Sequence, residues 1–214
     1  MPLPRRAGRG TLGRMPVRTV VLVEGASDRA AVETLAARRG LDLRAAGAVV
    51  VTMGGAGGAG RAVDAALAGG AGVCGLYDAA EERFVARALR RHGLTESGDR
   101  AELAALGFHA CVRDLEDELV RALGVEATLA VVEQEGHLDR FRTFSGQPEW
   151  RGRPAVDRLH RFWGTTAGRK EHYGRALAAA APAEPPPIGA LLDDVVARAA
   201  GRPVPLPHGA TDET

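Results

Sequence analysis

Short apolar runs alternate with segments of helical periodicity along the first half of the chain. Four such runs occupy residues 18–23, 48–53, 73–77 and 108–112, and the first two are rich in β-branched residues. Each is too short for a packed helix and is typical of a strand buried on both faces of a parallel sheet. Repeated strand–helix units favour right-handed crossovers between parallel strands, so we expect an α/β, Rossmann-like fold with a four-stranded parallel sheet.

Helices are expected between these strands and throughout the second half. The spacing of apolar residues predicts helices over residues 30–39, 61–68, 79–92, 115–123, 126–134, 156–163, 169–180 and 188–199. Ser27 is a suitable N-cap for the first of them. Residues 140–153 carry no clear periodicity and are expected to form a loop.

The same patterns suggest four parts of the chain. We expect an α/β domain over residues 18–123 and a C-terminal helical extension over residues 124–200. Residues 1–17 are rich in Arg, Gly and Pro and should form a disordered arm. Residues 201–214 are Pro-rich and polar and should be a frayed tail.

Composition excludes several classes of function. The formal net charge of +1 argues against a strongly basic coat for nucleic acid. No run of about 18 apolar residues is present, and the N-terminus lacks a secretory signal, so we expect a cytoplasmic protein. Cys74 and Cys111 lie in apolar runs and should be buried thiols rather than zinc ligands, because no Cys/His cluster accompanies them.

Acidic residues follow two of the expected strands. Glu24 directly follows the first strand, Asp28 lies four residues later, and Asp78 follows the third strand. The carboxyl ends of parallel strands share one rim of a sheet, where ligands bind. Converging carboxylates repel one another unless a cation is bound, and hard oxygen ligands suit Mg²⁺ or Mn²⁺. Asp28 also has a purely structural interpretation, because an acid in the first turn stabilises a helix.

Two further segments have alternative interpretations. The Gly-rich residues 54–60 form either a flexible turn or a phosphate cradle, and they lack the Lys of a Walker A loop. The acidic residues 114–118 open a helix, either as a solvated first turn or as a source of a metal ligand in Glu116.

Lysine is nearly absent from the chain. Lys170 is the single lysine among 28 basic residues, so Arg serves wherever a generic positive charge is sufficient. Position 170 is therefore a candidate for a site that requires a compact ammonium group.

These motifs together resemble a known family. The segment VLVEGASD, a Gly-Gly pair after the second strand and GLYDAAE after the third are similar to the TOPRIM domain of topoisomerases, bacterial primases and OLD-family nucleases. The segments DLEDEL and FWGTTAGRKEHYGRAL resemble the OLD-type branch. The resemblance covers about residues 18–200, and its specificity comes from the order and spacing of short motifs.

The resemblance implies two-metal cleavage or transfer at a nucleic-acid phosphodiester. Glu24 would be catalytic and would hold the first Mg²⁺ or Mn²⁺ with Asp28 and Asp78. Glu116 would help to hold a second ion, and Lys170 would stabilise charge on the phosphate or the leaving oxygen.

The sequence departs from the family pattern at two places. Ala80 replaces the second Asp of the usual D-x-D motif, and Glu81 is a candidate replacement ligand. The alternative function is therefore a weakly active or inactive module that binds nucleic acid or a nucleotide. No ATPase domain precedes the TOPRIM-like segment, so we expect a free-standing protein whose ATP-driven control, if any, comes from a partner chain.

A basic and aromatic segment is the expected nucleic-acid contact. DNA is favoured over RNA as the partner, and the chain could also form a homodimer. Arginines near aromatic residues can follow a nucleic-acid backbone, although a packed connector explains the same pattern. The candidate contacts are Arg140, Arg142, Arg151, Arg153 and Arg169.

Overall fold

The computed structural model describes residues 17–166 and 168–201, so most of the expected arm and tail lie outside the described residues. Its centre is a four-stranded, fully parallel sheet in the order β2-β1-β3-β4. The strands are β1 (Thr19–Val23), β2 (Ala48–Thr52), β3 (Gly72–Asp78) and β4 (Phe108–Cys111). This confirms the predicted α/β class and the all-parallel sheet.

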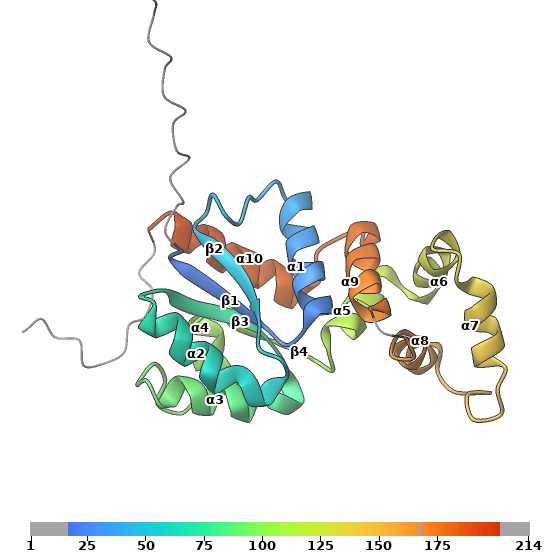
Figure 1. The fold of residues 1–214 in the computed structure, drawn as a ribbon, viewed down its shortest axis with the longest axis horizontal. Coiled ribbons are helices and arrows are strands. Elements are labelled where there is room, and N and C mark those ends of the chain that lie inside the picture. Colours follow the sequence, from blue (N-terminus) through green and yellow to red (C-terminus); the bar gives the residue numbers. More distant parts are fainter. Residues whose placement is uncertain (1–16, 167, 202–214) are drawn as a thin grey trace, which may run out of the picture.

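Helices cover both faces of the sheet (Figure 1). Helix α1 (Ala26–Arg38) packs on one face, with Val21 and Val23 of β1 in the same apolar cluster. Helices α2 (Ala59–Ala68) and α3 (Glu82–Arg90) pack on the other face, against the alternate β1 residues Val20 and Leu22. Burial of β1 on both faces explains why its sequence is continuously apolar.

The second half of the chain is helical. Its helices are α5 (Leu115–Leu123), α6 (Val125–Gln134), α7 (Leu138–Ser145), α8 (Ala155–Trp163), α9 (Arg169–Ala180) and α10 (Pro186–Ala199). The remaining short elements of the first half are η1 (Ala56–Gly58), η2 (Ala79–Glu81) and α4 (Arg100–Ala105). Figure 1 shows α6, α7 and α8 grouped at one end of the molecule, past α5 and α9. Among the described residues, none of the helices is sufficiently long and apolar to cross a membrane.

The last two helices return to the sheet. Helix α9 packs along α1, and α10 packs against β3 and β4. Arg198 of α10 is buried and donates hydrogen bonds to the carbonyl oxygens of Val73 (3.0 Å) and Leu106 (2.7 Å). Residues that we expected to form an extension therefore complete the cover of one sheet face.

Three local expectations were wrong. Residues 138–145 form α7 rather than part of a loop, because Phe141 and Ser145 lie four apart on its buried face. The short helix α4 was not predicted, although Asp99 caps it by accepting a hydrogen bond from the Glu102 amide. Helix α1 begins at Ala26, so Ser27 lies inside the helix instead of capping it.

Gly174 sets the distance between α1 and α9. A Cβ atom at this position would lie 2.5 Å from the Ser27 carbonyl oxygen, too close for a real contact. Because that neighbour is backbone, we expect Gly174→Ala to lower the free energy of unfolding by about 1–3 kcal/mol. Chemical denaturation would measure this. Gly164→Ala is the matched control, since its Cβ would meet nothing closer than 3.5 Å, and an equal loss in both variants would contradict the prediction.

Candidate metal centre

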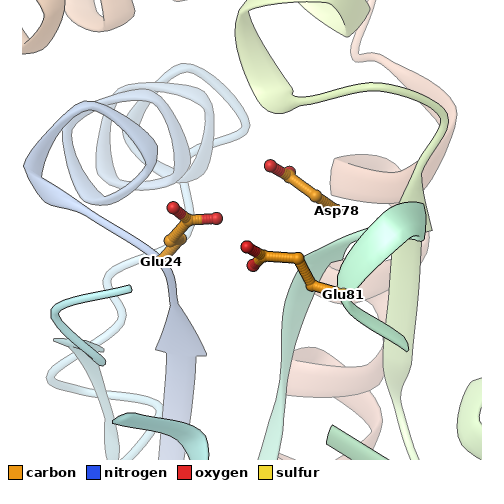
Figure 2. A group of neighbouring side chains, drawn as sticks. All are labelled: Glu24, Asp78 and Glu81. Carbon is orange, nitrogen blue, oxygen red and sulfur yellow. The ribbon is translucent and has the colours of Figure 1, made fainter. Parts of the chain in front are cut away.

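Three carboxylates converge where the carboxyl ends of β1 and β3 lie side by side. Glu24 directly follows β1, Asp78 is the last residue of β3, and Glu81 closes the short helix η2 that follows. One oxygen from each residue lies within 4.8 Å of the others. Figure 2 shows the three side chains pointing toward one another. The chain crosses from one side of β1 to the other between β2 and β3, which makes this rim the topological switch point of the sheet.

The electrostatics of this cluster favour a cation. Burial and the nearby charge of Glu24 raise the pKa of Asp78 to about 8. Partial burial and Glu24 also raise the pKa of Glu81. Both shifts show carboxylates whose negative charges are poorly compensated. The set of hard oxygen donors fits Mg²⁺ or Mn²⁺, so the residues present suit the implied metal.

A second acidic group lies along the same pocket. Glu116 of α5 is 4% exposed and accepts a hydrogen bond from the Ser27 hydroxyl at 2.8 Å. Burial and the charge of Glu116 raise the pKa of Asp28 to about 7. Asp28 also accepts a hydrogen bond from the Gly25 amide at 2.8 Å, so its structural role at the start of α1 is present. Asp28 thus lies close to Glu116, and it also interacts electrostatically with Glu24 and Asp78, the residues with which we expected it to share an ion.

Lys170 lies at the edge of this second group. Its ammonium nitrogen is 3.4 Å from Glu116 Oε1, and half of the side chain is exposed. Partial burial opposes its charge, but Glu116 and Asp114 outweigh that effect and raise the pKa of Lys170. The lysine is therefore charged at neutral pH and open to a ligand in the pocket.

Asp114 is a pocket residue that sequence reasoning missed. It lines the same hollow as Glu24, Asp28 and Glu116, and His160 Nδ1 of α8 is 3.2 Å from its Oδ2. Burial would raise the pKa of Asp114, but hydrogen bonds from His160 and the Asp117 amide hold it below the usual value. Its position just after β4 was a usable signal, because acids follow β1 and β3 in the same way.

The Gly-rich turn supports the site rather than forming a separate one. The amides of Gly54 and Gly55 both donate to the carbonyl oxygen of Glu24, at 3.1 and 3.3 Å. Both glycines have positive φ angles, which glycine adopts at little cost. Two N–H groups of this segment are thus engaged by the chain itself, which disfavours a phosphate cradle there.

The five candidate nucleic-acid arginines do not form one surface. Arg153 lies beside Trp150 and Lys170 in a hollow next to the metal centre, whereas Arg142 lines a different hollow between α6, α7 and α8. Arg169 packs over the Phe162 ring, with its guanidinium carbon 4.4 Å from the centroid. Arg151 donates to the Gly146 carbonyl oxygen, and Arg140 is close enough to His137 to help lower its pKa, after burial and Arg169.

Comparisons with known proteins agree with this geometry. Residues 17–79 match the model of the family described as Overcoming lysogenization defect protein-like, TOPRIM domain. This part of the chain is therefore similar to an OLD-like TOPRIM domain. A comparison with curated proteins gives no significant match.

Solved structures of OLD proteins share the fold over most of the chain. The C-terminal region of the Burkholderia pseudomallei OLD protein aligns with a TM-score of 0.63 at 18% identity, covering 86% of this chain and 98% of that one. The C-terminal region of the Xanthomonas campestris pv. campestris OLD protein, in a structure phased with mercury, aligns with a TM-score of 0.60 at 22% identity, covering 86% and 96%. These likenesses confirm the predicted fold, and the family model supports the resemblance to OLD-like TOPRIM proteins over residues 17–79. A TOPRIM domain indicates a metal-binding function related to nucleic acids, and the acidic cluster is compatible with Mg²⁺.

The raised pKa values predict how the metal-free protein responds to pH. The folded state holds protons on Asp28 and Asp78 up to about pH 7 and 8, whereas unfolded aspartates release them near 3.8. In the folded state these two groups bind more protons over this interval than they do in the unfolded state, so their contribution to stability falls as pH rises from about 4 to about 8. We expect the melting temperature in EDTA to decrease over this range, and Mg²⁺ to restore it most strongly near pH 8 because it binds the ionised carboxylates.

The variant Asp78→Asn tests whether the raised pKa of Asp78 causes this pH dependence. It removes the group with the most raised pKa, so it should flatten the pH dependence and weaken the stabilisation by Mg²⁺. A melting temperature in EDTA that rises between pH 5 and 8 would contradict the assignment.

Proposed function

We propose that this protein is a Mg²⁺- or Mn²⁺-dependent nuclease that hydrolyses nucleic-acid phosphodiesters. The observation that carries the proposal is the convergence of Glu24, Asp78 and Glu81 at the switch point of a TOPRIM sheet. The OLD TOPRIM family is associated with nuclease activity. DNA is the favoured substrate and the cytoplasm the favoured location.

Each group in the pocket has a role in this proposal. Glu24, Asp78 and Glu81 would hold one ion, and Asp28 with Glu116 would help to hold a second. When bound, such ions polarise the phosphate and lower the pKa of a coordinated water. Glu24 would be the central ligand, because it follows β1, the strand that pairs with β3, and its carboxylate lies close to those of both Asp78 and Glu81.

Lys170 and Asp114 would act on the substrate side of the pocket. The ammonium group of Lys170 stabilises negative charge that develops on the phosphate or on the leaving oxygen. The contact with His160 favours the ionised form of Asp114, whose side chain lines the same pocket as Glu24, Asp28 and Glu116. The hydrolysis itself adds water across the P–O bond, so one product carries the phosphate and the other a hydroxyl.

Nicking of supercoiled plasmid DNA tests the proposal. The wild-type protein is expected to nick plasmid with Mg²⁺ or Mn²⁺ and not in EDTA. The absence of nicking with either metal, and with single-stranded DNA or RNA as alternative substrates, would overturn it.

Position 80 favours a second candidate function, a module that binds nucleic acid without cleaving it. Ala80 is exposed and supplies no ligand where the family pattern has Asp. If the natural protein is inert and Ala80→Asp alone creates metal-dependent nicking, this second function is the correct one.

Glu81 decides between the two candidates. If Glu81 replaces the missing ligand, Glu81→Gln should raise the Kd for Mg²⁺ by about tenfold or more, which corresponds to about 1.4 kcal/mol. Adding Ala80→Asp to Glu81→Gln should recover most of that loss. Isothermal titration calorimetry with Mg²⁺ measures both effects. An unchanged Kd in Glu81→Gln would show that Glu81 is not a metal ligand.

A further inference from the structure

A basic hollow adjoins the acidic pocket. It lies between Arg113, two residues after β4, the segment that precedes α8, α8 itself and the start of α9. Its lining residues are Arg113, Trp150, Arg153, Asp157, His160, Arg161, Gly164 and Lys170. Four of these side chains are cations and one is an acid, and that acid, Asp157, is paired with Arg113 at 2.7 Å. The hollow is therefore net positive, whereas the neighbouring pocket is net negative.

The two hollows adjoin at a shared residue. Lys170 lines both of them. His160, which lines the basic hollow, is also the residue that contacts Asp114 in the acidic pocket. A polyanion lying in the basic hollow would thus pass Lys170 directly before it reaches the carboxylates.

The basic hollow also presents a planar surface. The ring of Trp150 stacks on Phe144, with centroids 5.2 Å apart and an angle of 30° between the planes. The guanidinium carbon of Arg153 lies 5.1 Å from the Trp150 centroid, and its Nε donates to the Glu149 carbonyl oxygen at 2.8 Å. Indole and guanidinium planes that are held in place in this way are suitable partners for stacking with a nucleobase.

We propose that this hollow binds a single-stranded segment of nucleic acid and leads it to the acidic pocket. The proposal rests on the nuclease function and adds the class of substrate. Arg113, Arg153 and Arg161 would contact successive phosphates, and Trp150 with Arg153 would stack an unpaired base. A duplex cannot use this surface in the same way, because its bases are already stacked on one another and paired.

The chain offers a direct probe of this contact. It has two tryptophans, and Trp163 is fully buried, so a change in tryptophan fluorescence on adding a ligand reports mainly on Trp150. We expect oligothymidylate, titrated in EDTA to prevent cleavage, to quench this fluorescence. A duplex of equal length should bind at least about tenfold more weakly, which corresponds to about 1.4 kcal/mol.

Charge reversal in the hollow provides the decisive comparison. The double variant Arg153→Glu/Arg161→Glu should bind oligothymidylate at least tenfold more weakly, and its salt dependence should fall by about 0.7 in slope per lost phosphate contact. The matched control is Arg44→Glu/Arg87→Glu, which changes the net charge equally at two exposed residues outside both hollows. Equal loss in both double variants, or equal binding of single strand and duplex, would overturn the proposal.

The assay separates this proposal from the nuclease function. Binding in EDTA requires no metal, so a protein that binds oligothymidylate through the hollow but never cleaves contradicts only the nuclease function. A protein that nicks plasmid with Mg²⁺, while its affinity for oligothymidylate is unchanged by Arg153→Glu/Arg161→Glu, contradicts only the proposal made here.

Discussion

Glu24→Gln is expected to reduce Mg²⁺-dependent nicking by about 10³-fold or more, the equivalent of about 4 kcal/mol in the barrier. Glutamine keeps the size of the side chain and one carbonyl oxygen, but it removes the charge that the ion requires. Glu24 is also the residue whose charge contributes to the raised pKa of both Asp78 and Glu81. The measurement is the initial rate of plasmid nicking at saturating Mg²⁺.

The loss in Glu24→Gln should not come from unfolding. Removing one of three mutually repelling carboxylates should leave the metal-free protein as stable as the wild type or more stable. Glu33→Gln is the matched control, because Glu33 is exposed on α1 and does not line the pocket. Nicking that persists at the wild-type rate in Glu24→Gln would contradict the location of the metal centre at this rim of the sheet.

The first acidic group could be predicted because it depends on local patterns. The runs at β1 and β3 are recognisable as buried parallel strands, and neighbouring parallel strands bring Glu24 and Asp78 to one edge. Glu81 was a candidate only because Ala80 breaks the family motif. Its approach to Glu24 depends on the first residues of the predicted 79–92 helix forming the separate short 3-10 helix η2, a distinction that apolar periodicity does not make.

The second group depends on contacts that sequence patterns do not contain. Ser27 and Glu116 are 89 residues apart, and they meet because α9 packs against both α1 and α5. The same limit applies to the basic hollow, where Arg113 and Arg161 join Arg153 from different elements. The candidate contacts therefore include Arg153 but neither Arg113 nor Arg161.

The helix α7 was missed for a different reason. Its apolar positions are few, and the intervening arginines made residues 140–153 look like a solvated loop. Leu138, Phe141 and Phe144 nevertheless pack against the main core from successive turns, which is the spacing of a helix. Burial by tertiary contacts thus outweighed a weak local signal.

Lys170→Met is the second change with a large expected effect. It should lower the nicking rate by about 10²–10³-fold, because it removes a positive charge from the place where negative charge develops on the substrate. It also removes the ion pair that Lys170 makes with the buried carboxylate of Glu116, which then depends more on the hydrogen bond from the Ser27 hydroxyl, so some loss of stability is expected as well. Activity and the free energy of unfolding must therefore be measured together.

Lys170→Arg separates the two roles of this side chain. An arginine keeps the charge and can still pair with Glu116, so a purely structural lysine would tolerate the change. A lysine that approaches the phosphate as a compact ammonium would not, because the guanidinium is planar, broader and differently hydrated. The chain uses arginine for its other 27 basic residues, so arginine at position 170 is the substitution that its own composition would favour. We expect Lys170→Arg to fold with wild-type stability and to lose most of its activity; wild-type nicking in this variant would reduce Lys170 to a partner of Glu116.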